Sequence, residues 1–351
     1  MTAPLLMKAL VLESPGSLVF REVTIPELGK GEVLVQVQAC GICGSDVSRV
    51  FGGEAYRYPL IPGHEFSGEI VDTRDPAHRA WLGKRVTVYP LIPCRRCPQC
   101  EAARYELCDQ YGYLGSRRDG GFAEYVAAPV LNCIELPETL DYDTGALSEP
   151  AAVTWHALKR SMMCPGDRVV VFGLGPIGLL FGYWARLAGC SRLIGVDIET
   201  GKFSLAASLG FDELLAPEDG RLSSRLSSLA EEGGVGLVAE ASGVGAALKE
   251  ALRVVAKRGN VLLLGNQGKE VLLLPDDFSR ILRKEIRLHG TWNSSHSRLE
   301  SDWREILDAQ SNRKVFLSPI ISHCIPLQEG VQVFSDMYNR SFSYSKVILT
   351  P

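Results

Sequence analysis

The chain has 351 residues, of which 46% are hydrophobic and 22% are charged, and its formal charge is −4. This length favours two domains with cores of their own, and the charge leaves no basic footprint for nucleic acid. No apolar run approaches the roughly 20 residues that span a bilayer, and Lys8 interrupts the N-terminal apolar stretch, unlike a signal peptide. We therefore expect a cytoplasmic protein that binds neither nucleic acid nor a membrane.

Short apolar or alternating runs, separated by glycine and proline, occupy the first 130 or so residues. Four of these runs are rich in β-branched residues and predict strands at 33–39, 68–73, 85–90 and 124–130. Helical patterns are few in this part of the chain. The sequence therefore predicts a β-rich, barrel-like first domain.

From about residue 158 the pattern changes to alternating strands and helices. The continuous apolar runs at 168–173 and 192–197 are typical of parallel strands buried on both faces. Between them, 176–189 has apolar residues at helical spacing and ends in glycine. Further strands at 237–243, 260–265 and 285–292, with a helix at 244–259, complete the pattern of an α/β domain with a doubly wound parallel sheet.

The alternation is lost after about residue 295. A predicted helix at 299–311 precedes a strand pattern at 345–351, which ends the chain. We expect this last strand to rejoin the first domain. That domain would then be discontinuous, with residues 1–157 and 295–351 flanking a second domain at 158–294.

A GxGxxG segment stands between the first predicted strand and helix of the second domain. In this context its glycines permit a tight turn, close approach of a pyrophosphate and close helix packing. The helix N-terminus presents free N–H groups to the phosphate. The alternative is a glycine-rich turn that binds nothing. The segment is Gly173-Leu174-Gly175-Pro176-Ile177-Gly178.

Asp197 ends the next predicted strand, 19 residues after Gly178. A carboxylate at this place binds both ribose hydroxyls and repels a 2′-phosphate, so NAD is favoured over NADP. Lys202 follows closely and has two interpretations. It either contacts the phosphates of the adenosine half or is a solvated helix residue.

Four of the ten cysteines are closely spaced in the first domain, in the pattern C-x2-C-x2-C-x7-C. In a reducing compartment such cysteines more often bind metal than form disulfides. Four thiolates close a tetrahedral zinc site and leave no position for a substrate, so the site would be structural. An iron–sulfur cluster is disfavoured because the last gap is too long for the bacterial ferredoxin spacing. The four are Cys94, Cys97, Cys100 and Cys108.

Two other strings of the first domain, GICGSD at 41–46 and GHE at 63–65, supply a thiol, an imidazole and a carboxylate. Such a set holds zinc and leaves a fourth position open, as a catalytic site needs. An isolated cysteine or histidine is more often a packing residue, so the two strings indicate a metal site only when they are taken together.

These strings, the four-cysteine lobe and the later GLGPIG resemble the zinc-containing medium-chain dehydrogenases, in that family's order and over essentially the whole chain. A glutamate after the ligand histidine is typical of the sorbitol dehydrogenase branch. Residues 115–125, 281–285 and 290–293 are similar to the galactitol-1-phosphate 5-dehydrogenase group. The resemblance implies a GroES-like catalytic domain with a structural zinc lobe at 90–110, a Rossmann NAD-binding domain, two zinc ions per chain, and a homodimer or homotetramer.

The resemblance also assigns roles to single residues. Cys43, His64 and Glu65 would be ligands of the catalytic zinc, and Glu149 would be a further ligand or would hold the zinc-bound water. Ser45 would hydrogen-bond the substrate oxygen and pass its proton outward, while hydride goes to the nicotinamide. Asp46 would fix the local loop. Many relatives carry a histidine three residues after Ser45; this chain has Ser48, so the outer proton relay must run differently.

The implied reaction converts a secondary alcohol of a polyol or polyol phosphate, galactitol 1-phosphate for example, to the ketose with NAD. Trp292 and Asn293 occupy the region where sorbitol dehydrogenase relatives contact substrate. Arg117 and Arg118 are candidate phosphate ligands, as are Arg49 and Arg57. The alternative is that Arg117 and Arg118 stiffen a surface loop by pairing with Asp119 or Glu124.

Three competing activities use the same chemistry: dehydrogenation of an unphosphorylated polyol, of a cyclitol or amino-cyclitol, or of a threonine-type substrate. A different class of function would be a non-catalytic protein that binds NAD and zinc on the same scaffold. Loss of Cys43, His64 or Ser45 would favour that class, and all three are present.

Overall fold

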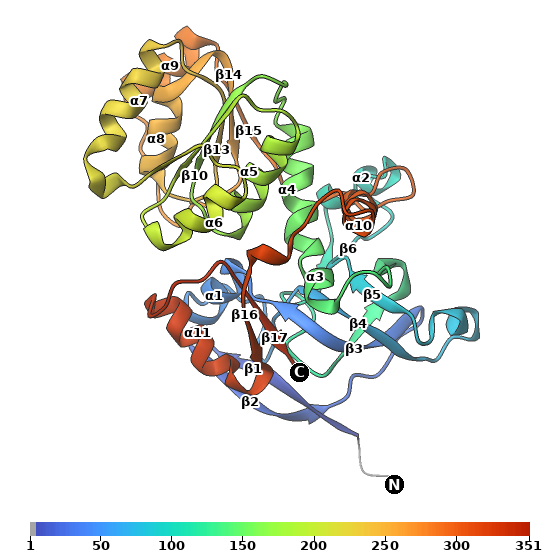
Figure 1. Cartoon of the computed structure of the whole chain (residues 1–351). Helices are drawn as coiled ribbons and strands as arrows, with labels where there is room; N and C mark the ends of the chain where they lie inside the picture. The colour runs from blue at the N-terminus through green and yellow to red at the C-terminus, as the bar shows by residue number, and fades with distance from the viewer. Residues whose placement is uncertain (1–4) are drawn as a thin grey trace. The chain divides into compact units, whose positions relative to one another are not determined.

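The computed structural model describes residues 5–351, apart from the side chain of Asp219, and divides into two compact units (Figure 1). Unit 1 comprises Met1–Ala152 and Ser295–Pro351, and unit 2 comprises Val153–Ser294. The boundary between them falls in helix α4 (Ser148–Arg160), slightly before the 157/158 boundary expected from the sequence. The domain boundary at 157/158 stays a prediction. Within residues 5–351, no helix is both long and apolar enough to cross a bilayer.

A seven-stranded sheet is the frame of unit 1. The strands run in the order β16-β17-β3-β4-β5-β9, and β8 also pairs with β3. The four strands predicted in the first 130 residues become β3, β4, β5 and β8, because their alternating apolar residues line the core. The bounds are β3 (Glu32–Gly41), β4 (Glu65–Thr73), β5 (Arg85–Val88), β8 (Tyr125–Pro129), β9 (Cys133–Glu135), β16 (Ile321–Pro326) and β17 (Lys346–Thr350).

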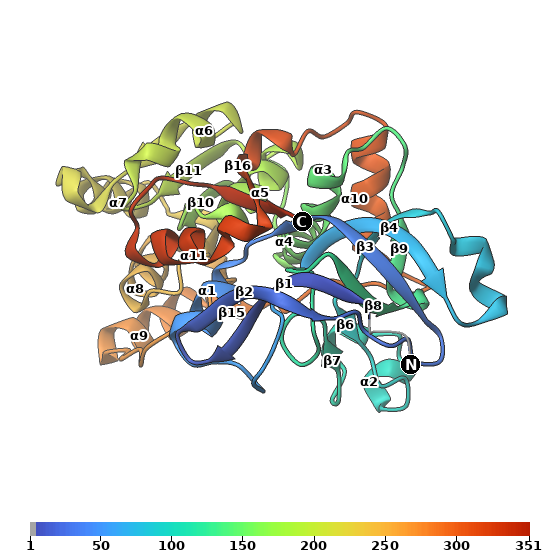
Figure 2. The same cartoon turned by 90° about the horizontal axis from the view of Figure 1, so that it is seen from below.

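The C-terminal strand β17 pairs antiparallel with β3, with Ile348 opposite Gly41. The end of the chain thus returns to the sheet of unit 1. Strand β16 and helix α11 (Gly330–Asn339) were not expected from the sequence. Figure 2 shows α11, in red, beside β2 and α1, which it contacts.

The remaining strands and α-helices of unit 1 lie outside the seven-stranded sheet. A hairpin of β1 and β2 packs on the core, and a two-stranded sheet of β6 and β7 leads to the four-cysteine lobe. Their bounds are β1 (Leu6–Ser14), β2 (Ser17–Thr24), β6 (Leu91–Ile92), β7 (Gly112–Tyr113), α1 (Gly44–Phe51), α2 (Pro98–Glu101), α3 (Tyr142–Ala146) and α10 (Asp302–Ser311).

Unit 2 contains a six-stranded parallel sheet in the order β12-β11-β10-β13-β14-β15. This is the doubly wound order expected from the alternating pattern, and its central strands are buried on both faces. The strands are β10 (Arg168–Phe172), β11 (Arg192–Val196), β12 (Glu213–Leu215), β13 (Val235–Glu240), β14 (Val255–Leu263) and β15 (Arg287–Gly290). The helices are α5 (Pro176–Leu187), α6 (Phe203–Ser208), α7 (Arg221–Glu231), α8 (Gly245–Val254) and α9 (Pro275–Lys284).

Two predicted helix boundaries were wrong. The helix expected over 244–259 ends at Val254, because Val255 already pairs with Val235 of β13 and is fully buried there. The helix expected from residue 299 begins at Asp302. Its N-cap is Ser301, whose side chain accepts a hydrogen bond from the Arg304 amide.

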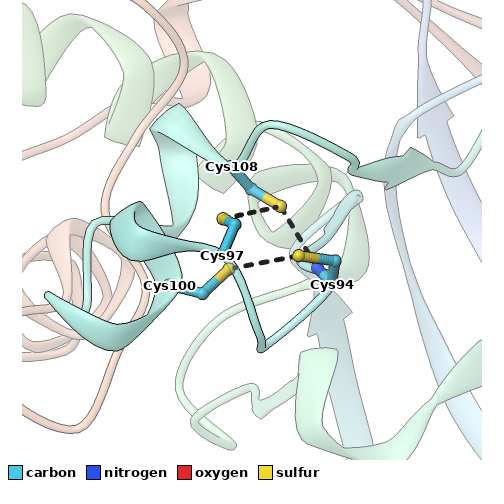
Figure 3. Close-up of side chains that lie close together, drawn as sticks. All are labelled: Cys94, Cys97, Cys100 and Cys108. Atoms are coloured by element: carbon cyan, nitrogen blue, oxygen red, sulfur yellow. Dashed lines mark hydrogen bonds between the residues drawn. The ribbon is translucent and has the colours of Figure 1, made fainter.

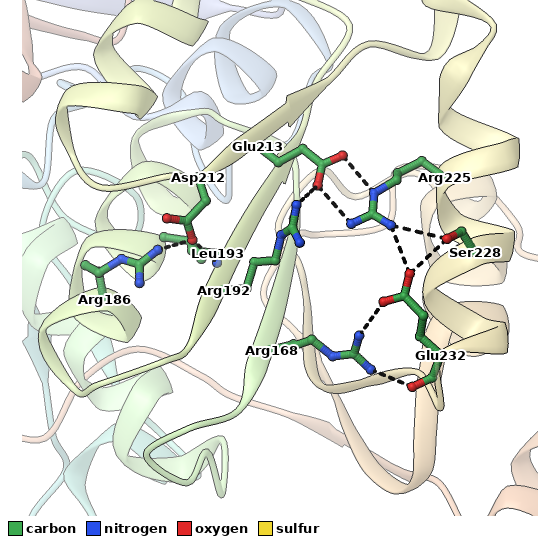
Figure 4. A network of polar contacts seen from close by, with 9 residues as sticks. All are labelled: Arg168, Arg186, Arg192, Leu193, Asp212, Glu213, Arg225, Ser228 and Glu232. Atoms are coloured by element: carbon green, nitrogen blue, oxygen red, sulfur yellow. Dashed lines mark hydrogen bonds and ion pairs between the residues drawn. The ribbon is translucent and has the colours of Figure 1, made fainter.

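A network of ion pairs joins strands β10, β11 and β12 to helix α7 in unit 2 (Figure 4). Glu213 on β12 binds Arg192 at 2.9 Å and Arg225 at 2.8 Å, and Glu232 binds Arg168 at 2.9 Å. Single ion pairs that are as exposed as these contribute roughly 0–1 kcal/mol to the free energy of unfolding. They stabilise this edge of the sheet because several of them are linked in one network. The network ties this edge of the sheet to the helix.

Candidate active site and metal centres

The turn between β3 and α1 positions Cys43. Strand β3 ends at Gly41, and Cys43 is the N-cap of α1. The carboxylate of Asp46 reaches back and accepts a hydrogen bond from the Cys43 amide at 3.1 Å. This contact fixes the turn, as was expected for Asp46.

Strand β4 brings the second string beside the first. It begins at Glu65, which lies opposite Gly41 in the antiparallel β3–β4 pair. The ligand atoms of Cys43, His64 and Glu65 consequently lie within 4.8 Å of one another, and His64 and Glu65 are buried. A thiolate, an imidazole and a carboxylate at this spacing fit a zinc site with an open position.

Asp46 also orients the histidine. Its buried Oδ1 lies 3.3 Å from His64 Nδ1 and 2.6 Å from Arg49 Nη1. Burial by itself would lower the pKa of His64, but the Asp46 carboxylate and Cys43 raise that pKa well above its ordinary value. A carboxylate beside Nδ1 favours the ring orientation in which Nε2 is free to bind a metal. This second task of Asp46 was not expected from the sequence.

Glu65 has a partner from the end of the chain. Lys346, the first residue of β17, donates to Glu65 Oε1 at 2.8 Å and to Oε2 at 2.6 Å. Its third donor binds the carbonyl of Ile42 at 3.0 Å. Both side chains are almost completely buried.

Glu149 lies in the first turn of α4 and is also buried. The hydroxyl of Tyr113 donates to Glu149 Oε1 at 3.3 Å, and the Tyr113 ring packs edge-on against His64. Burial, with help from the Glu65 carboxylate, raises the pKa of Glu149 to about 7. Glu149 does not belong to the group of mutually close ligand atoms, so its direct binding to zinc stays a prediction.

The four cysteines of the lobe converge on one point (Figure 3). The Sγ atoms of Cys94 and Cys100 are 4.0 Å apart, and those of Cys97 and Cys108 are 3.9 Å apart. A tetrahedral ion with Zn–S bonds of about 2.3 Å requires sulfur separations of about 3.8 Å, so the arrangement fits zinc. The backbone amide of Arg96 lowers the pKa of Cys94 to about 6, and burial raises that of Cys100 to about 12.

The GxGxxG loop of unit 2 has the shape expected of a phosphate cradle. Gly173 has φ +90°, and a Cβ there would meet the Ser242 amide at 2.8 Å. A Cβ on Gly178 would collide with the carbonyl of Gly173. A Cβ on Gly175 would enter open space, which leaves room for a ligand at the N-terminus of α5. The loop thus fits a dinucleotide.

The carboxylate of Asp197 is bound to this loop. It accepts hydrogen bonds from the amides of Leu174 at 2.5 Å and Glu199 at 2.8 Å, which leaves lone pairs for ribose hydroxyls. Lys202 pairs with Glu199 at 2.7 Å, and its side chain is only 13% exposed. The interpretation of Lys202 as a solvated residue was therefore wrong, and its contact with cofactor stays a prediction.

The arginines proposed for a substrate phosphate have other partners. Arg118 pairs with Glu32 at 2.6 Å and Arg57 with Asp119 at 2.6 Å, so the expected partners of Arg118, Asp119 or Glu124, were wrong. The reason is that β3 presents Glu32 to the loop after β7, whereas Glu124 binds the amide of Lys8.

Arg117 differs from the other arginines of this loop. Its guanidinium stacks 4.5 Å from the ring centre of Tyr56 and 4.2 Å from that of Tyr111, and it donates to the Tyr111 carbonyl. A pocket of about 470 Å³ in unit 1 is lined by Arg57, Arg117 and Arg118 together with apolar residues of β1, β2 and β8. The three grouped ligand residues do not line that pocket.

Other predicted site residues are placed as follows. Ser45 is half-buried in the first turn of α1. In unit 2, Trp292 is 48% exposed, and Asn293 has φ +55° and accepts a hydrogen bond from the Ser294 amide. Any contact of these two residues with substrate stays a prediction.

Comparison with known proteins assigns the family. Residues 29–138 match the alcohol dehydrogenase GroES-like domain, and residues 176–312 match the zinc-binding dehydrogenase family. Galactitol 1-phosphate 5-dehydrogenase of Escherichia coli (strain K12) is 32% identical over 98% of this chain and 100% of its own length. The chain belongs to the zinc-containing medium-chain alcohol dehydrogenase family.

Further relatives agree with this assignment. Sorbitol dehydrogenase of Halalkalibacterium halodurans is 32% identical, over 98% of this chain and 99% of its own. The crystal structure of the E. coli galactitol-1-phosphate dehydrogenase has a TM-score of 0.90, with 98% of this chain and 100% of that one covered. A zinc-binding dehydrogenase from Sinorhizobium meliloti 1021, bound to NADP, is 35% identical with a TM-score of 0.88, over 99% and 100% of the chains. This dehydrogenase is thus an enzyme that acts on CH–OH groups with zinc and a nicotinamide cofactor.

The sequence did not point to two residues of this dehydrogenase's active site. Lys346 is a lone charge at the start of an apolar C-terminal strand, and such a charge signals a buried partner. Tyr113 lies between the lobe and the arginine pair and carries no comparable signal. Its role is visible only because β7 faces α4 through the Tyr113–Glu149 bond.

Proposed function

We propose that this enzyme transfers hydride between a secondary alcohol of a polyol or polyol phosphate and NAD. The observation that carries the proposal is the convergence of Cys43, His64 and Glu65, with Glu149 held close by, on one buried site. Zinc held there would polarise the substrate oxygen as a Lewis acid. A second zinc, held by the four-cysteine lobe, would stabilise the fold.

The chain's own residues would orient the alcohol and take its proton. Hydride leaves carbon for the nicotinamide, and the hydroxyl proton passes to the Ser45 hydroxyl and then outward. Ser48 is exposed and cannot replace an imidazole, so water or the cofactor ribose would complete the relay. Glu149, with a pKa of about 7, could hold a proton near neutral pH, which suits a group that shares the site with a reacting hydroxyl.

We propose that Asp197 sets a preference for NAD. The S. meliloti relative is bound to NADP, so the family alone does not decide the cofactor. In Asp197→Ala, loss of a charge-assisted bond and of the repulsion of the 2′-phosphate should narrow the NAD:NADP ratio of kcat/KM by roughly tenfold to a hundredfold. Steady-state kinetics with both cofactors checks this. Better use of NADP by the unmodified enzyme would refute the role given to Asp197.

The substrate is proposed to be polyhydroxylated, and its phosphorylation is the point to test. Asn293 donates and accepts hydrogen bonds, as a polyol requires, and Trp292 would pack on its carbons. Among the arginines named above, Arg117 makes no ion pair with a carboxylate in the described structure, so it is the proposed phosphate ligand. Galactitol 1-phosphate is the model compound, by the likeness to that dehydrogenase.

A panel of polyols, cyclitols, threonine and polyol phosphates, followed by reduced nicotinamide absorbance, tests the substrate class. We expect galactitol 1-phosphate to exceed galactitol in kcat/KM, and Arg117→Ala to remove at least a tenfold part of that advantage, as expected for a charge-assisted bond. Arg258→Ala, an exposed arginine of unit 2, is the control. If the phosphate brings no advantage, the enzyme acts on a plain polyol or cyclitol; if no compound of the panel reacts, the polyol proposal fails and the substrate is another alcohol.

We also propose a cytoplasmic homodimer, or a homotetramer built from such dimers, formed through unit 2. Strand β15 is an edge strand that pairs with β14 alone in the described sheet. Beside it in sequence, Leu274, Phe278 and Leu282 form a stripe along α9 at four-residue spacing, and all three are exposed. An edge strand with an apolar neighbour suits a two-fold contact with a second copy.

Sedimentation equilibrium of Phe278→Asp tests the dimer proposal. A buried aspartate should weaken self-association by at least tenfold, because an unpaired charge in an apolar interface is costly. Leu187→Asp, at an exposed leucine of α5, should leave the association unchanged. A monomeric unmodified enzyme, or an equal effect of both changes, would exclude this interface.

A further inference from the structure

The zinc site contains more negative charge than a divalent ion balances. Cys43 as thiolate, Glu65, and Glu149 in the ionised form that a metal ligand requires contribute three negative groups, whereas Asp46 already has Arg49 as its own counter-charge at 2.6 Å. Lys346 is the cation in contact with Glu65. With Lys346 present, a site that holds zinc is close to neutral, which a buried site requires.

The ammonium group of Lys346 is fully hydrogen-bonded at this site. An ammonium group has three N–H donors, and all three have acceptors: both oxygens of Glu65 and the carbonyl of Ile42. With about 1% of its surface exposed, the residue has no route to water for its charge. The lysine therefore holds Glu65 through two charge-assisted bonds.

The backbone of the sheet leaves room for the Lys346–Glu65 ion pair. Gly41 lies opposite both Glu65 on β4 and Ile348 on β17. A Cβ on Gly41 would overlap the Glu65 carboxylate, so the glycine leaves the volume that the carboxylate occupies. Strands β3, β4 and β17 thus enclose the ion pair on three sides.

The two carboxylates of the site are held very differently. Both oxygens of Glu65 bind a cation at 2.6–2.8 Å, whereas Glu149 accepts a hydrogen bond from a neutral donor, Tyr113, at 3.3 Å. A charged pair at short distance is stronger than a long neutral bond. Glu149 is therefore the carboxylate that moves more easily.

We propose that Lys346 is a positioning residue that restrains Glu65 beside the zinc and leaves Glu149 as the carboxylate that exchanges with substrate. The proposal rests on the proposed function, because it assumes zinc at Cys43, His64 and Glu65. It adds that the two carboxylates have different roles, since Glu65 stays beside the metal and Glu149 exchanges. Without Lys346, Glu65 would be a buried carboxylate with the metal as its nearest cation, and it would bind that metal with both oxygens.

The test compares Lys346→Met, which keeps the length and removes the charge, with Lys346→Arg, which keeps the charge. Lys314→Met, at an exposed lysine of unit 1, is the control. The first readout is the visible spectrum of the cobalt(II)-substituted enzymes without substrate, since ligand-field absorption weakens as the coordination number rises. The lobe contributes the same background in every variant.

We expect Lys346→Met to weaken the cobalt absorption and to reduce kcat by roughly tenfold to a hundredfold, with a smaller change in KM, as for other residues that orient metal ligands. Lys346→Arg should restore the spectrum and most of kcat. In the double variant Lys346→Met with Glu65→Gln, the effects of the two changes should not add, because they remove one interaction.

A well-folded Lys346→Met enzyme with the unmodified cobalt spectrum would overturn the proposal. So would strictly additive effects in the double variant. If Lys346→Met alone fails to fold, the double variant, which removes both buried charges, is compared with Glu65→Gln alone: equal cobalt spectra and kcat are expected, and a further loss in the double variant would overturn the proposal. The spectrum is recorded without substrate. An enzyme that oxidises no polyol therefore refutes the proposed function and leaves the spectral test of Lys346 intact.

Discussion

Replacing Cys43 with alanine should reduce kcat/KM by about a thousandfold or more. Among residues 5–351, the thiolate is one of three side chains whose ligand atoms come together at the catalytic site, and the other two cannot hold zinc tightly without it. A metal that polarises an oxygen supplies several kcal/mol of stabilisation to the reaction, and each 1.36 kcal/mol corresponds to about tenfold in rate.

The fold of Cys43→Ala should persist. The backbone contact that fixes the turn, from the Cys43 amide to Asp46, does not involve the thiol, and Cys43 is only partly buried. We expect the melting temperature to change by a few degrees at most, while the zinc content falls by one ion per chain. Cys164→Ala, at an exposed cysteine of unit 2, should keep both zinc and activity. Retained turnover in a Cys43→Ala sample with one zinc would contradict the assignment.

Local patterns in the sequence predicted most of what is local in the structure. The β-branched runs became β3, β4, β5 and β8, and GLGPIG formed the loop before α5, because each depends on neighbouring residues alone. The four cysteines fall within one short segment, so their convergence follows from spacing. The positions of Cys43, His64 and Glu65 required the family resemblance as well.

Contacts across long stretches of chain were not predictable in this way. Lys346 binds Glu65, which lies 281 residues earlier, and only the pairing of β17 with β3 brings them together. Arg118 selects Glu32 over the nearby Asp119 because β8 and β3 are neighbours in the sheet. Charge and sequence proximity favoured Asp119 as the partner of Arg118, which was wrong. The pairing of the strands in the sheet brings Glu32 to Arg118 instead.

The opposite kind of loss is expected for Cys100→Ala: a less stable enzyme that still turns over. The lobe has little core of its own, since α2 spans only Pro98–Glu101, and its cysteine sulfurs are its main point of convergence. Two of its residues that are not glycine, Arg95 and Ala103, have φ of 60° and 57°. Such conformations cost about 1–3 kcal/mol each and persist only where the surroundings enforce them.

Loss of one thiolate should therefore release the second zinc and unfold the lobe. Structural zinc contributes up to about 10–16 kcal/mol in isolated zinc-finger peptides; if about 4 kcal/mol is lost here, the melting temperature should fall by roughly 10 °C. Tyr111, which directly follows the lobe, packs edge-on against Tyr113, which binds Glu149, so a modest fall in kcat, less than tenfold, is expected below the melting temperature. Calorimetry, zinc analysis and kinetics on one preparation separate these effects. Loss of activity as severe as in Cys43→Ala, with no loss of stability, would show that the lobe serves catalysis directly.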